Sequence, residues 1–277
     1  MRTVAWAVLS ALLLAPLWAR ADRVFNVAVG VVQATGEDPD PWIWDVLNNS
    51  PLKPAGWDFV NPHNNISGNY WKTNLASLSL PELLDYQLVM ITNHQATPFT
   101  AEENAKIRGW VAAGGIIWLD DCGNMDPQNF FLPFSFVSYD GQSNSGSKRA
   151  LVPSHPFFNS VYTLTGSEIA HLGHPDYSSH VINFTPGDWT VLLDNGTASL
   201  PDMIVRRAGL GWVIVSSDDF GCAINDYGNP EDIRFAYNIL DWARTASVPT
   251  PTALCGGLAI GAFFILRRAL RRNTRPA

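Results

Sequence analysis

Cysteine is scarce in this sequence. The 277-residue chain contains only three cysteines, and Cys255 lies in an apolar run near the C-terminus. The central region therefore holds Cys122 and Cys222 alone, which allows at most one disulfide bond within it. This scarcity excludes a fold held together by several disulfides, and no cysteine spacing supports a structural zinc site.

Basic side chains are also few outside the two ends of the chain. Residues 22–251 contain 11 lysines and arginines against 25 aspartates and glutamates, a formal charge of 11 − 25 = −14. An acidic domain of this kind repels phosphate backbones, so we expect no nucleic-acid partner. With 47% apolar residues, the chain can still bury one sizeable core.

Long apolar runs occur near the two ends. Val4 to Trp18 follows Arg2 and precedes Ala19-Arg20-Ala21, which is the order of a secretory signal peptide with a cleavage site before Asp22. An uncleaved anchor is the alternative. Thr252 to Leu266 is apolar and is followed at once by an arginine cluster, which the positive-inside rule places in the cytoplasm.

These features predict four segments. Residues 1–21 are a signal peptide, residues 22–245 a domain, residues 246–251 a linker, and residues 252–277 a transmembrane or sorting segment with a basic tail. We therefore expect an extracytoplasmic, membrane-anchored protein in the bacterial periplasm or at the cell surface. The C-terminal segment resembles the PEP-CTERM type of sorting signal, which implies an exosortase-like processing enzyme as a partner; Thr250 stands where glutamate is usual in such signals.

Alternating strand and helix patterns predict the fold. Residues 87–93 are typical of a β-strand, Thr100 and Glu103 form a capping box for the next helix, and Gly114 can end that helix with a positive φ. Residues 116–119 form the following strand, so the two strands should be parallel. Further strands are predicted over 24–32, 57–60, 189–194, 203–207 and 212–217, and helices over 41–48 with Asp40 as N-cap, over 74–86, and from Pro230 with Asn229 as N-cap.

Two of the predicted strands end alike, with a pair of aspartates and a nearby cysteine. The pairs are Asp120 and Asp121 before Cys122, and Asp218 and Asp219 before Cys222. The strand ends of a doubly wound sheet gather at one edge, where ligands bind, so we expect these two loops to be neighbours and to form the working surface.

The four aspartates have two interpretations. Carboxylates clustered on loops suit Ca²⁺ or Mg²⁺, so a divalent-cation site is one hypothesis. Alternatively, each pair caps the turn that follows it through hydrogen bonds to backbone N–H groups. We favour the second interpretation, which requires no cofactor.

Cys122 also has two interpretations. It could be a nucleophile, with His94 at the end of the neighbouring strand as its base, or with His171 or His174 in that role. However, Asp120 and Asp121 beside the thiol disfavour the thiolate. An oxidising compartment favours instead a Cys122–Cys222 disulfide.

Other histidines and aromatic residues are less informative. The histidines of the segment 171–180, which are His171, His174 and His180, are expected in a surface loop. A group of aromatic residues could line a sugar-binding face, although alternation with apolar neighbours indicates that most are core. These are Trp42, Trp44, Trp57, Tyr70 and Trp71.

Several motifs, in order, resemble one family. Residues 88–94, the glycines after the capped helix, and Asp120-Asp121 followed by Met125-Asp126 resemble the domain of unknown function 4159, and residues 154–162 and 229–234 resemble its later motifs. The resemblance implies the flavodoxin-like fold of class I glutamine amidotransferases. It implies no particular activity.

We therefore predict an α/β domain with a flavodoxin-like, class I glutamine amidotransferase-like, mostly parallel sheet and helices on both faces. The predicted function is an exported, membrane-tethered, non-catalytic binding or envelope-interaction domain with a protein or glycan ligand at the strand-end loops. The alternative is a thiol- or metal-dependent hydrolase or amidase-like enzyme that uses the same loops, with Cys122 or a bound cation activating the attack.

Overall fold

The computed structural model describes the central domain, over residues 23–31, 42–68, 70–92, 100–120, 138–139, 147–174, 180–196, 200–217 and 220–246. The predicted signal peptide and the C-terminal segment 252–277 lie outside these ranges. Within them, none of the helices combines the length and the apolar character needed to cross a membrane.

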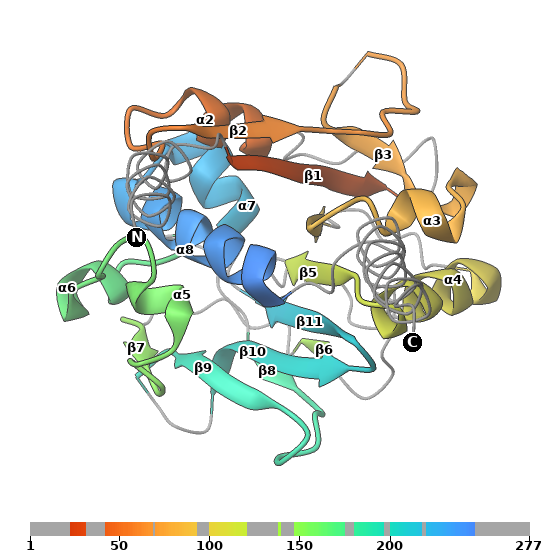
Figure 1. Ribbon diagram of the computed structural model, residues 1–277. Coiled ribbons are helices and arrows are strands. Elements are labelled where there is room, and N and C mark those ends of the chain that lie inside the picture. Colours follow the sequence, from red (N-terminus) through yellow and green to blue (C-terminus); the bar gives the residue numbers. More distant parts are fainter. Residues whose placement is uncertain are drawn as a thin grey trace, which may run out of the picture.

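A mixed nine-stranded sheet runs through the domain (Figure 1). The strand order is β2-β1-β4-β5-β11-β10-β9-β7, with β3 also beside β1. The strands are β1 (Arg23–Val31), β2 (Trp57–Val60), β3 (Lys72–Asn74), β4 (Leu88–Thr92), β5 (Ile116–Asp120), β7 (Arg149–Ala150), β9 (Thr190–Asp194), β10 (Pro201–Ala208) and β11 (Gly211–Ser216). A separate two-stranded sheet joins β6 (Ser138–Tyr139) to β8 (Val181–Ile182).

The order of the parallel strands identifies the fold. β1 lies inside the sheet, between β2 and β4, and β5 and β11 continue in parallel on the β4 side. This is the flavodoxin-like doubly wound order, in which the chain changes direction across the sheet after its first strands. The remaining strands, β10, β9 and β7, are antiparallel to their neighbours. The predicted fold class is confirmed.

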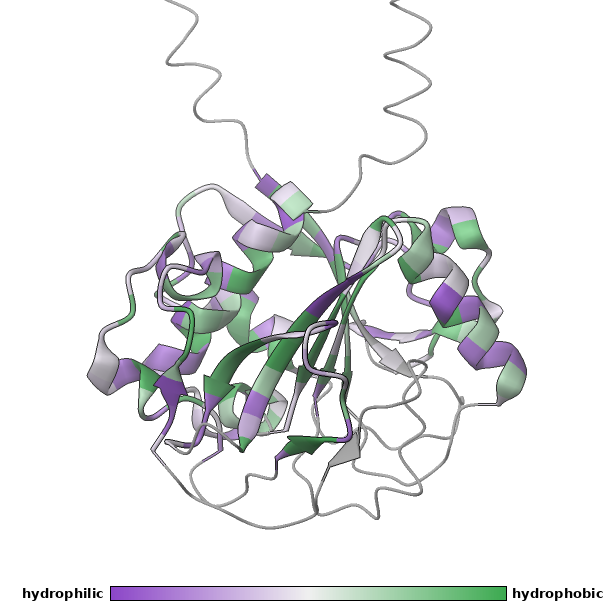
Figure 2. Cartoon of the chain, turned by 90° about the horizontal axis from the view of Figure 1, so that it is seen from below, coloured by the Kyte–Doolittle hydropathy of each residue, from purple (hydrophilic) through white to green (hydrophobic). Residues whose placement is uncertain are grey.

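Helices cover both faces of the sheet (Figure 2). Side chains alternate along each strand, so Phe25 and Val27 of β1 pack into one apolar core and Ala28 into the other. The first core lies under α8 and the second under α4. The helical elements are α2 (Ile43–Asn49), η1 (Leu75–Ser77), α3 (Leu80–Leu83), α4 (Ala101–Ala112), α5 (Pro156–Asn159), α6 (Gly166–Ile169), α7 (Phe220–Cys222), the π-helix η2 (Ala223–Tyr227) and α8 (Pro230–Ala246).

Helix α4 begins and ends as the sequence predicts. The Thr100 hydroxyl accepts from the Glu103 N–H at 3.2 Å, and the Glu103 carboxylate accepts from the Thr100 N–H at 2.7 Å. At the other end Gly114 has a φ of 124°, a conformation that costs glycine little. The chain then enters β5 directly, so local sequence signals determine both ends of α4 and the start of β5.

Two predicted helices differ from the structure. The helix expected over 74–86 is interrupted, because the Asn74 side chain accepts from the Ala76 N–H at 3.0 Å and starts a short 3-10 turn. A separate helix, α3, then begins after Ser79, which forms a capping box with Glu82 at the start of this helix. The helix expected from Pro41 begins at Ile43, with Trp42 rather than Asp40 as the N-cap residue.

The β10–β11 hairpin packs closely against the end of α4. The Leu210 N–H donates to the Ala112 carbonyl at 3.0 Å, and the Trp212 N–H donates to the Gly115 carbonyl at 3.1 Å. A Cβ atom on Gly211 would lie 2.0 Å from the Gly115 carbonyl oxygen. Only glycine allows this approach of the two backbones.

Candidate functional site

The carboxyl edge of the sheet is the candidate site. β5, β11 and β9 end at this edge and β10 begins there. In open α/β sheets, ligands bind outside the carboxyl ends of the strands. Polar side chains at this edge are fully buried, and they are Asp120, Asp194, Asp202, Ser216 and Ser217.

Asp120 joins the ends of β5 and β11 to the chain that follows β11. Its Oδ1 accepts from the Ser216 hydroxyl at 2.5 Å, and its Oδ2 accepts from the Gly221 N–H at 2.7 Å. Ser216 in turn accepts from the Trp118 indole N–H at 2.7 Å. Because both carboxylate oxygens already accept hydrogen bonds from the protein, Asp120 fixes the geometry of the edge.

Asp194 shapes the same edge at the end of β9. The Arg149 guanidinium donates to its two oxygens, from Nε at 3.2 Å and from Nη2 at 2.7 Å. Bonding to Asp194 raises the pKa of Arg149 above its ordinary value. The Gly196 N–H donates to Asp194 Oδ1 at 3.1 Å, so the carboxylate also holds the turn after β9. This bidentate pair fixes β7 against β9.

Asp232 lies in the first turn of α8 and is fully buried. Its Oδ1 accepts from the Gly173 N–H at 2.7 Å, and its Oδ2 accepts from the Asn229 amide at 3.1 Å. Burial raises the pKa of Asp232 to about 7, and the bonds from Gly173 and Asn229 lower it less strongly. The sequence presents Asp232 as an ordinary first-turn acid, which is why its burial could not be predicted.

The structure corrects the prediction that the histidines of the segment 171–180 all lie in a surface loop. His171 is exposed, but only 3% of His174 and 2% of His180 are accessible, so these two are not surface loop residues. The bond from Gly173 to Asp232 draws the chain against α8 and buries the next residue, His174. Tyr227, which is 52% exposed, lies edge-on to the His174 ring at 5.1 Å between centroids.

The predicted site residues are only partly described. The ends of the two strands that precede the acidic loops are neighbours, because Asp120 pairs with Ser216 across β5 and β11. His94, Asp121, Cys122, Asp218 and Asp219 lie outside the described residues. The disulfide, the nucleophile and the four-aspartate cation site therefore stay predictions.

Cys222 lies in α7, next to the end of β5. Its thiol donates to the Asp226 carboxylate at 3.4 Å, and a neighbouring carboxylate disfavours the thiolate. Over the described ranges, no group of three or more histidine, cysteine, aspartate or glutamate side chains is placed to hold a metal ion.

The aromatic residues divide as expected between core and surface. Trp44, Trp57 and Trp71 are buried, at 0%, 6% and 5% exposure. Trp42 at 50% and Tyr70 at 46% are exposed. Trp42 follows the carboxyl end of β1, whereas Tyr70 lies between β2 and β3.

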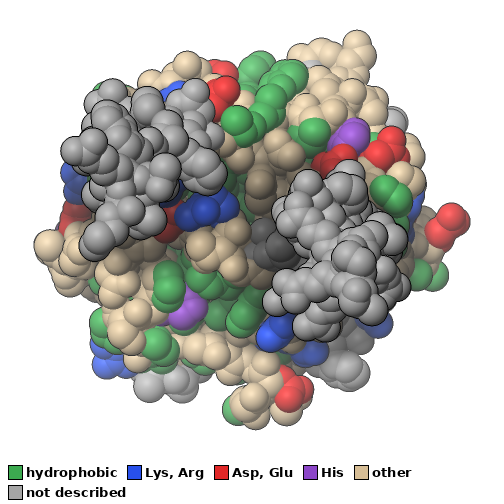
Figure 3. All heavy atoms as spheres, viewed as in Figure 1, with side chains coloured by type: hydrophobic (Ala, Val, Ile, Leu, Met, Phe, Trp, Pro, Cys, Tyr) green, Lys and Arg blue, Asp and Glu red, His purple; other side chains and the backbone are tan. Residues whose placement is uncertain are grey.

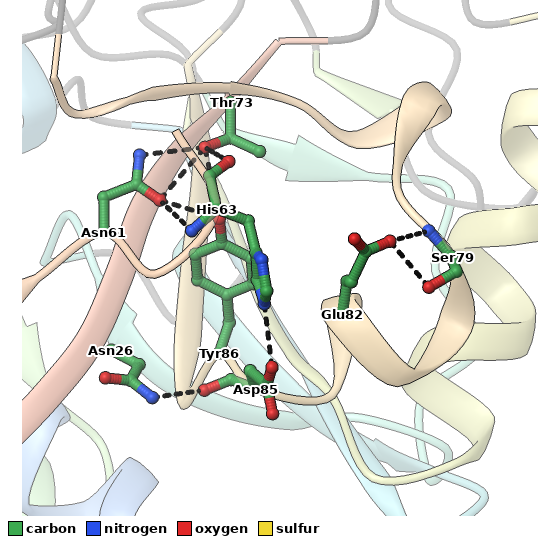
Figure 4. Close-up of polar contacts among 8 residues, drawn as sticks. All are labelled: Asn26, Asn61, His63, Thr73, Ser79, Glu82, Asp85 and Tyr86. Carbon is green, nitrogen blue, oxygen red and sulfur yellow. Dashed lines mark hydrogen bonds and ion pairs between the residues drawn. The ribbon is translucent and has the colours of Figure 1, made fainter. Parts of the chain in front are cut away.

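A second polar cluster, which the sequence analysis missed, lies beside β3 and α3 (Figure 4). The Tyr86 hydroxyl donates to Asn61 Oδ1 at 2.7 Å, and the Asn61 amide donates to Thr73 Oγ1 at 2.9 Å. His63 Nε2 lies 2.7 Å from Asp85 Oδ2 at the outer side of the cluster. Burial raises the pKa of Tyr86 to about 12, so its hydroxyl keeps its proton and remains a donor. The high asparagine content of residues 61–69 is the one sequence signal that could have indicated it.

The sequence of this chain matches the model of one protein family. The sequence model of the domain of unknown function DUF4159 matches residues 59–243, which is more than half of the chain. No curated protein sequence matches.

Two of the solved structures that match are distant likenesses. The cytoplasmic protein STM3548 from Salmonella typhimurium has a TM-score of 0.47 at 12% identity, covering 79% of this chain and 98% of that one. A putative ThuA-like protein from Bacteroides uniformis has a TM-score of 0.49 at 11% identity, covering 81% and 92%. At these scores neither likeness carries an argument about activity, and the fold assignment rests on the strand order.

Proposed function

This chain belongs to the DUF4159 family, and on that premise we propose that it is an exported, membrane-tethered domain that binds a ligand at the carboxyl edge of its sheet without converting it. The bonding of Asp120 is the observation that carries the proposal. A catalytic carboxylate needs an oxygen free to exchange a proton or contact substrate. Asp120 is instead fully buried, and each of its oxygens accepts a hydrogen bond inside the protein, from Ser216 and from Gly221.

Exposed aromatic rings support binding at this edge. Tyr227 is half exposed and its ring lies against the buried His174, so it offers a flat face in a fixed orientation. Trp42, also half exposed, is the N-cap residue of α2, the element that follows β1 in the chain. Rings of this kind stack on sugars and anchor protein side chains. The ligand is therefore a glycan or a protein segment.

A thermal-shift screen of the full-length chain in detergent tests the binding. The probes are a panel of soluble saccharides and a panel of short peptides. We expect at least one class to raise the melting temperature, and Tyr227→Ala to abolish that rise. Leu210→Ala, which removes an equally exposed apolar side chain at the turn between β10 and β11, is the control and should leave the rise intact.

The same samples distinguish binding from catalysis. If the probe that stabilises the protein is recovered unchanged after prolonged incubation, the binding proposal stands. Conversion of the probe, lost in Cys122→Ser or after chelation of divalent cations, would contradict it and favour the alternative hydrolase.

Cell fractionation tests the tethering. We expect the full chain in the membrane fraction and the domain accessible to protease added outside the cytoplasmic membrane. Removal of residues 252–277 should release the domain into the soluble extracytoplasmic fraction. Retention of the domain in the cytoplasm would contradict the proposal.

A further inference from the structure

The end of α8 lies close, along the chain, to the proposed membrane segment. α8 ends at Ala246, and only residues 247–251 separate it from the apolar run that begins at Thr252. A chain of this length spans at most about 20 Å. Because the proposed tethering holds Thr252 at the membrane, it also holds the end of α8 within about that distance of the bilayer.

Contacts around the end of α8 place it at the amino end of the parallel strands. The Arg23 guanidinium, at the start of β1, donates to Asp241 Oδ1 at 3.1 Å. The ring of Trp242 lies 5.3 Å between centroids from that of Trp212, at the start of β11. The turn between β10 and β11 and the end of α4 are bonded to each other at the same end. The carboxyl edge, with the proposed ligand site, is therefore the opposite end of the domain.

The charged side chains of the amino end differ in balance from those of the rest of the domain. Its basic side chains lie in β1, in the turn before β2, in α4, in β10 and in α8, and they are Arg23, Lys53, Arg108, Arg207 and Arg244. Its acidic side chains over the described residues are Asp58, Asp85, Asp188 and Asp241. This end thus carries a formal 5 − 4 = +1, and the remainder of residues 22–251 carries 6 − 21 = −15.

The four arginines of this end are exposed. Figure 3 shows the side of the molecule at which α8 ends, and basic side chains are in view on it. Arg23 and Arg244 share the Asp241 carboxylate, at 3.1 and 3.5 Å. Arg108 and Arg207 lie beside the hairpin turn, on α4 and β10. Exposed guanidinium groups on the side that carries the tether are suited to anionic headgroups.

Helix dipoles explain only part of this polarity. Both α4 and α8 have two acidic side chains in their first turns, and α8 has Arg244 in its last turn. Such placements are favourable in any helix. Arg23 and Arg207 lie on strands, however, and sheets have only small net dipoles. The basic character of the amino end is therefore a property of the surface and not of single helices.

We propose that the amino end of the domain docks on the anionic phospholipid headgroups of the membrane to which the chain is tethered, with Arg108 and Arg207 in contact with the bilayer. This inference rests on the proposed tethering. Each basic side chain near an anionic bilayer favours the docked state about fivefold, and the short tether keeps this surface within reach of the headgroups. The same headgroups repel the acidic remainder, so both effects favour one orientation.

This orientation restricts the ligand of the carboxyl edge. β11 has six residues and spans about 20 Å between the two ends. The docked domain therefore presents its ligand site on the side away from the bilayer. Its ligand is a glycan or protein segment of the cell envelope beyond the membrane, and the headgroup of a membrane lipid is excluded.

Energy transfer to labelled lipids measures the orientation. A fluorescent amino acid replaces either Ala55, beside the start of β1, or Ala101, at the far end of α4, and both positions are exposed. The full-length chains are reconstituted into vesicles of equal phosphatidylcholine and phosphatidylglycerol with an acceptor on the headgroups. We expect more transfer from position 55 than from position 101. The difference should shrink in phosphatidylcholine alone and at about 0.5 M salt, which screens the headgroup charge.

Arg207→Glu tests the docking surface itself. We expect it to lower the ratio of docked to undocked chains by about tenfold or more, seen as reduced transfer from position 55, while the chain still floats with the vesicles. Lys72→Glu makes the same charge change on β3, beside Val29 in the carboxyl half of β1. It is the matched control and should leave the transfer unchanged.

Three outcomes contradict the proposals, and they differ from one another. Equal transfer from the two positions, or more from position 101, would overturn the docking. So would transfer from position 55 that salt, lipid charge and Arg207→Glu all leave unchanged. A chain that does not float with the vesicles at all would contradict the tethering, and the docking would fall with it.

Discussion

The buried carboxylate of Asp120 illustrates how one residue can join three parts of a chain. Replacement by alanine leaves the Ser216 hydroxyl and the Gly221 N–H without their acceptor inside the protein. We expect Asp120→Ala to lower the free energy of unfolding by about 3 kcal/mol or more, measured by urea denaturation. Asp120→Asn, which keeps one acceptor and the shape, should cost less. An equal loss for both variants would show that the hydrogen bonds are not the cause.

Asp232 makes stability depend on pH in an unusual direction. Its folded-state pKa of about 7 lies above the ordinary value of 3.8, so the folded protein binds the proton more tightly than the unfolded chain. The contribution of this group is therefore fully present below about pH 4 and is lost as the pH rises through about 7. The side chain introduced by Asp232→Asn cannot lose a proton, so we expect the free energy of unfolding of this variant to fall less than that of the wild type between pH 4 and pH 7. The difference between the variant and the wild type should therefore move in favour of the variant over this range.

Urea denaturation at several pH values measures this difference directly. The exposed Asp188→Asn removes one surface charge and is the control for charge alone. A constant difference between Asp232→Asn and wild type across this range would contradict the assignment.

At the scale of elements, the β10–β11 hairpin packs tightly against the end of α4. A Cβ atom on Gly211 would lie 2.0 Å from the Gly115 carbonyl oxygen and 2.3 Å from that of Val111. Gly211→Ala should therefore destabilise the protein by roughly 2–4 kcal/mol. Gly109 lies in α4, and nothing lies within 4 Å of its Cβ position. Gly109→Ala should therefore stabilise the protein by about 0.5–1 kcal/mol. Thermal and urea unfolding of both variants measure the contrast.

Elements with strong local signals could be predicted from the sequence. The capping box of Thr100 and Glu103 and the glycine stop at Gly114 gave α4 to within a residue at each end. The helix expected over 74–86 failed because the Asn74 side chain and the Ser79 capping box act over two or three residues. Such short signals interrupt the helix, although the spacing of the apolar residues across it remains that of a continuous helix.

The site could be predicted only in part, for a related reason. The adjacency of Asp120, at the end of β5, to Ser216, at the end of β11, follows from strand pairing, which the sequence pattern indicates. The burial of His174, His180 and Asp232 depends on contacts such as Gly173 to Asp232, which join residues 59 positions apart. No local pattern specifies contacts of that range.

At the scale of the whole molecule, the predicted disulfide would join distant parts of the chain. Gly221, just before Cys222, is bonded to Asp120, which lies two residues before Cys122. Closing a loop of this length contributes about 4–5 kcal/mol in the chain-entropy account. We expect Cys122→Ser and Cys222→Ser to lower the unfolding midpoint equally. Titration of two free thiols, beyond that of Cys255, in the denatured and unreduced protein would rule the bond out.

The position of β11 governs how the domain can assemble. β11 is the last strand along the described residues, yet it lies between β5 and β10 and is the strand that joins the parallel and antiparallel parts of the sheet. Its contact between Ser216 and Asp120 spans 96 residues. During synthesis, β1, β2, β4 and β5 therefore emerge as an incomplete sheet with an open edge at β5. Nearly the whole domain must be synthesised before β11 closes that edge, so until then the unfinished sheet is exposed to pairing with the wrong strand.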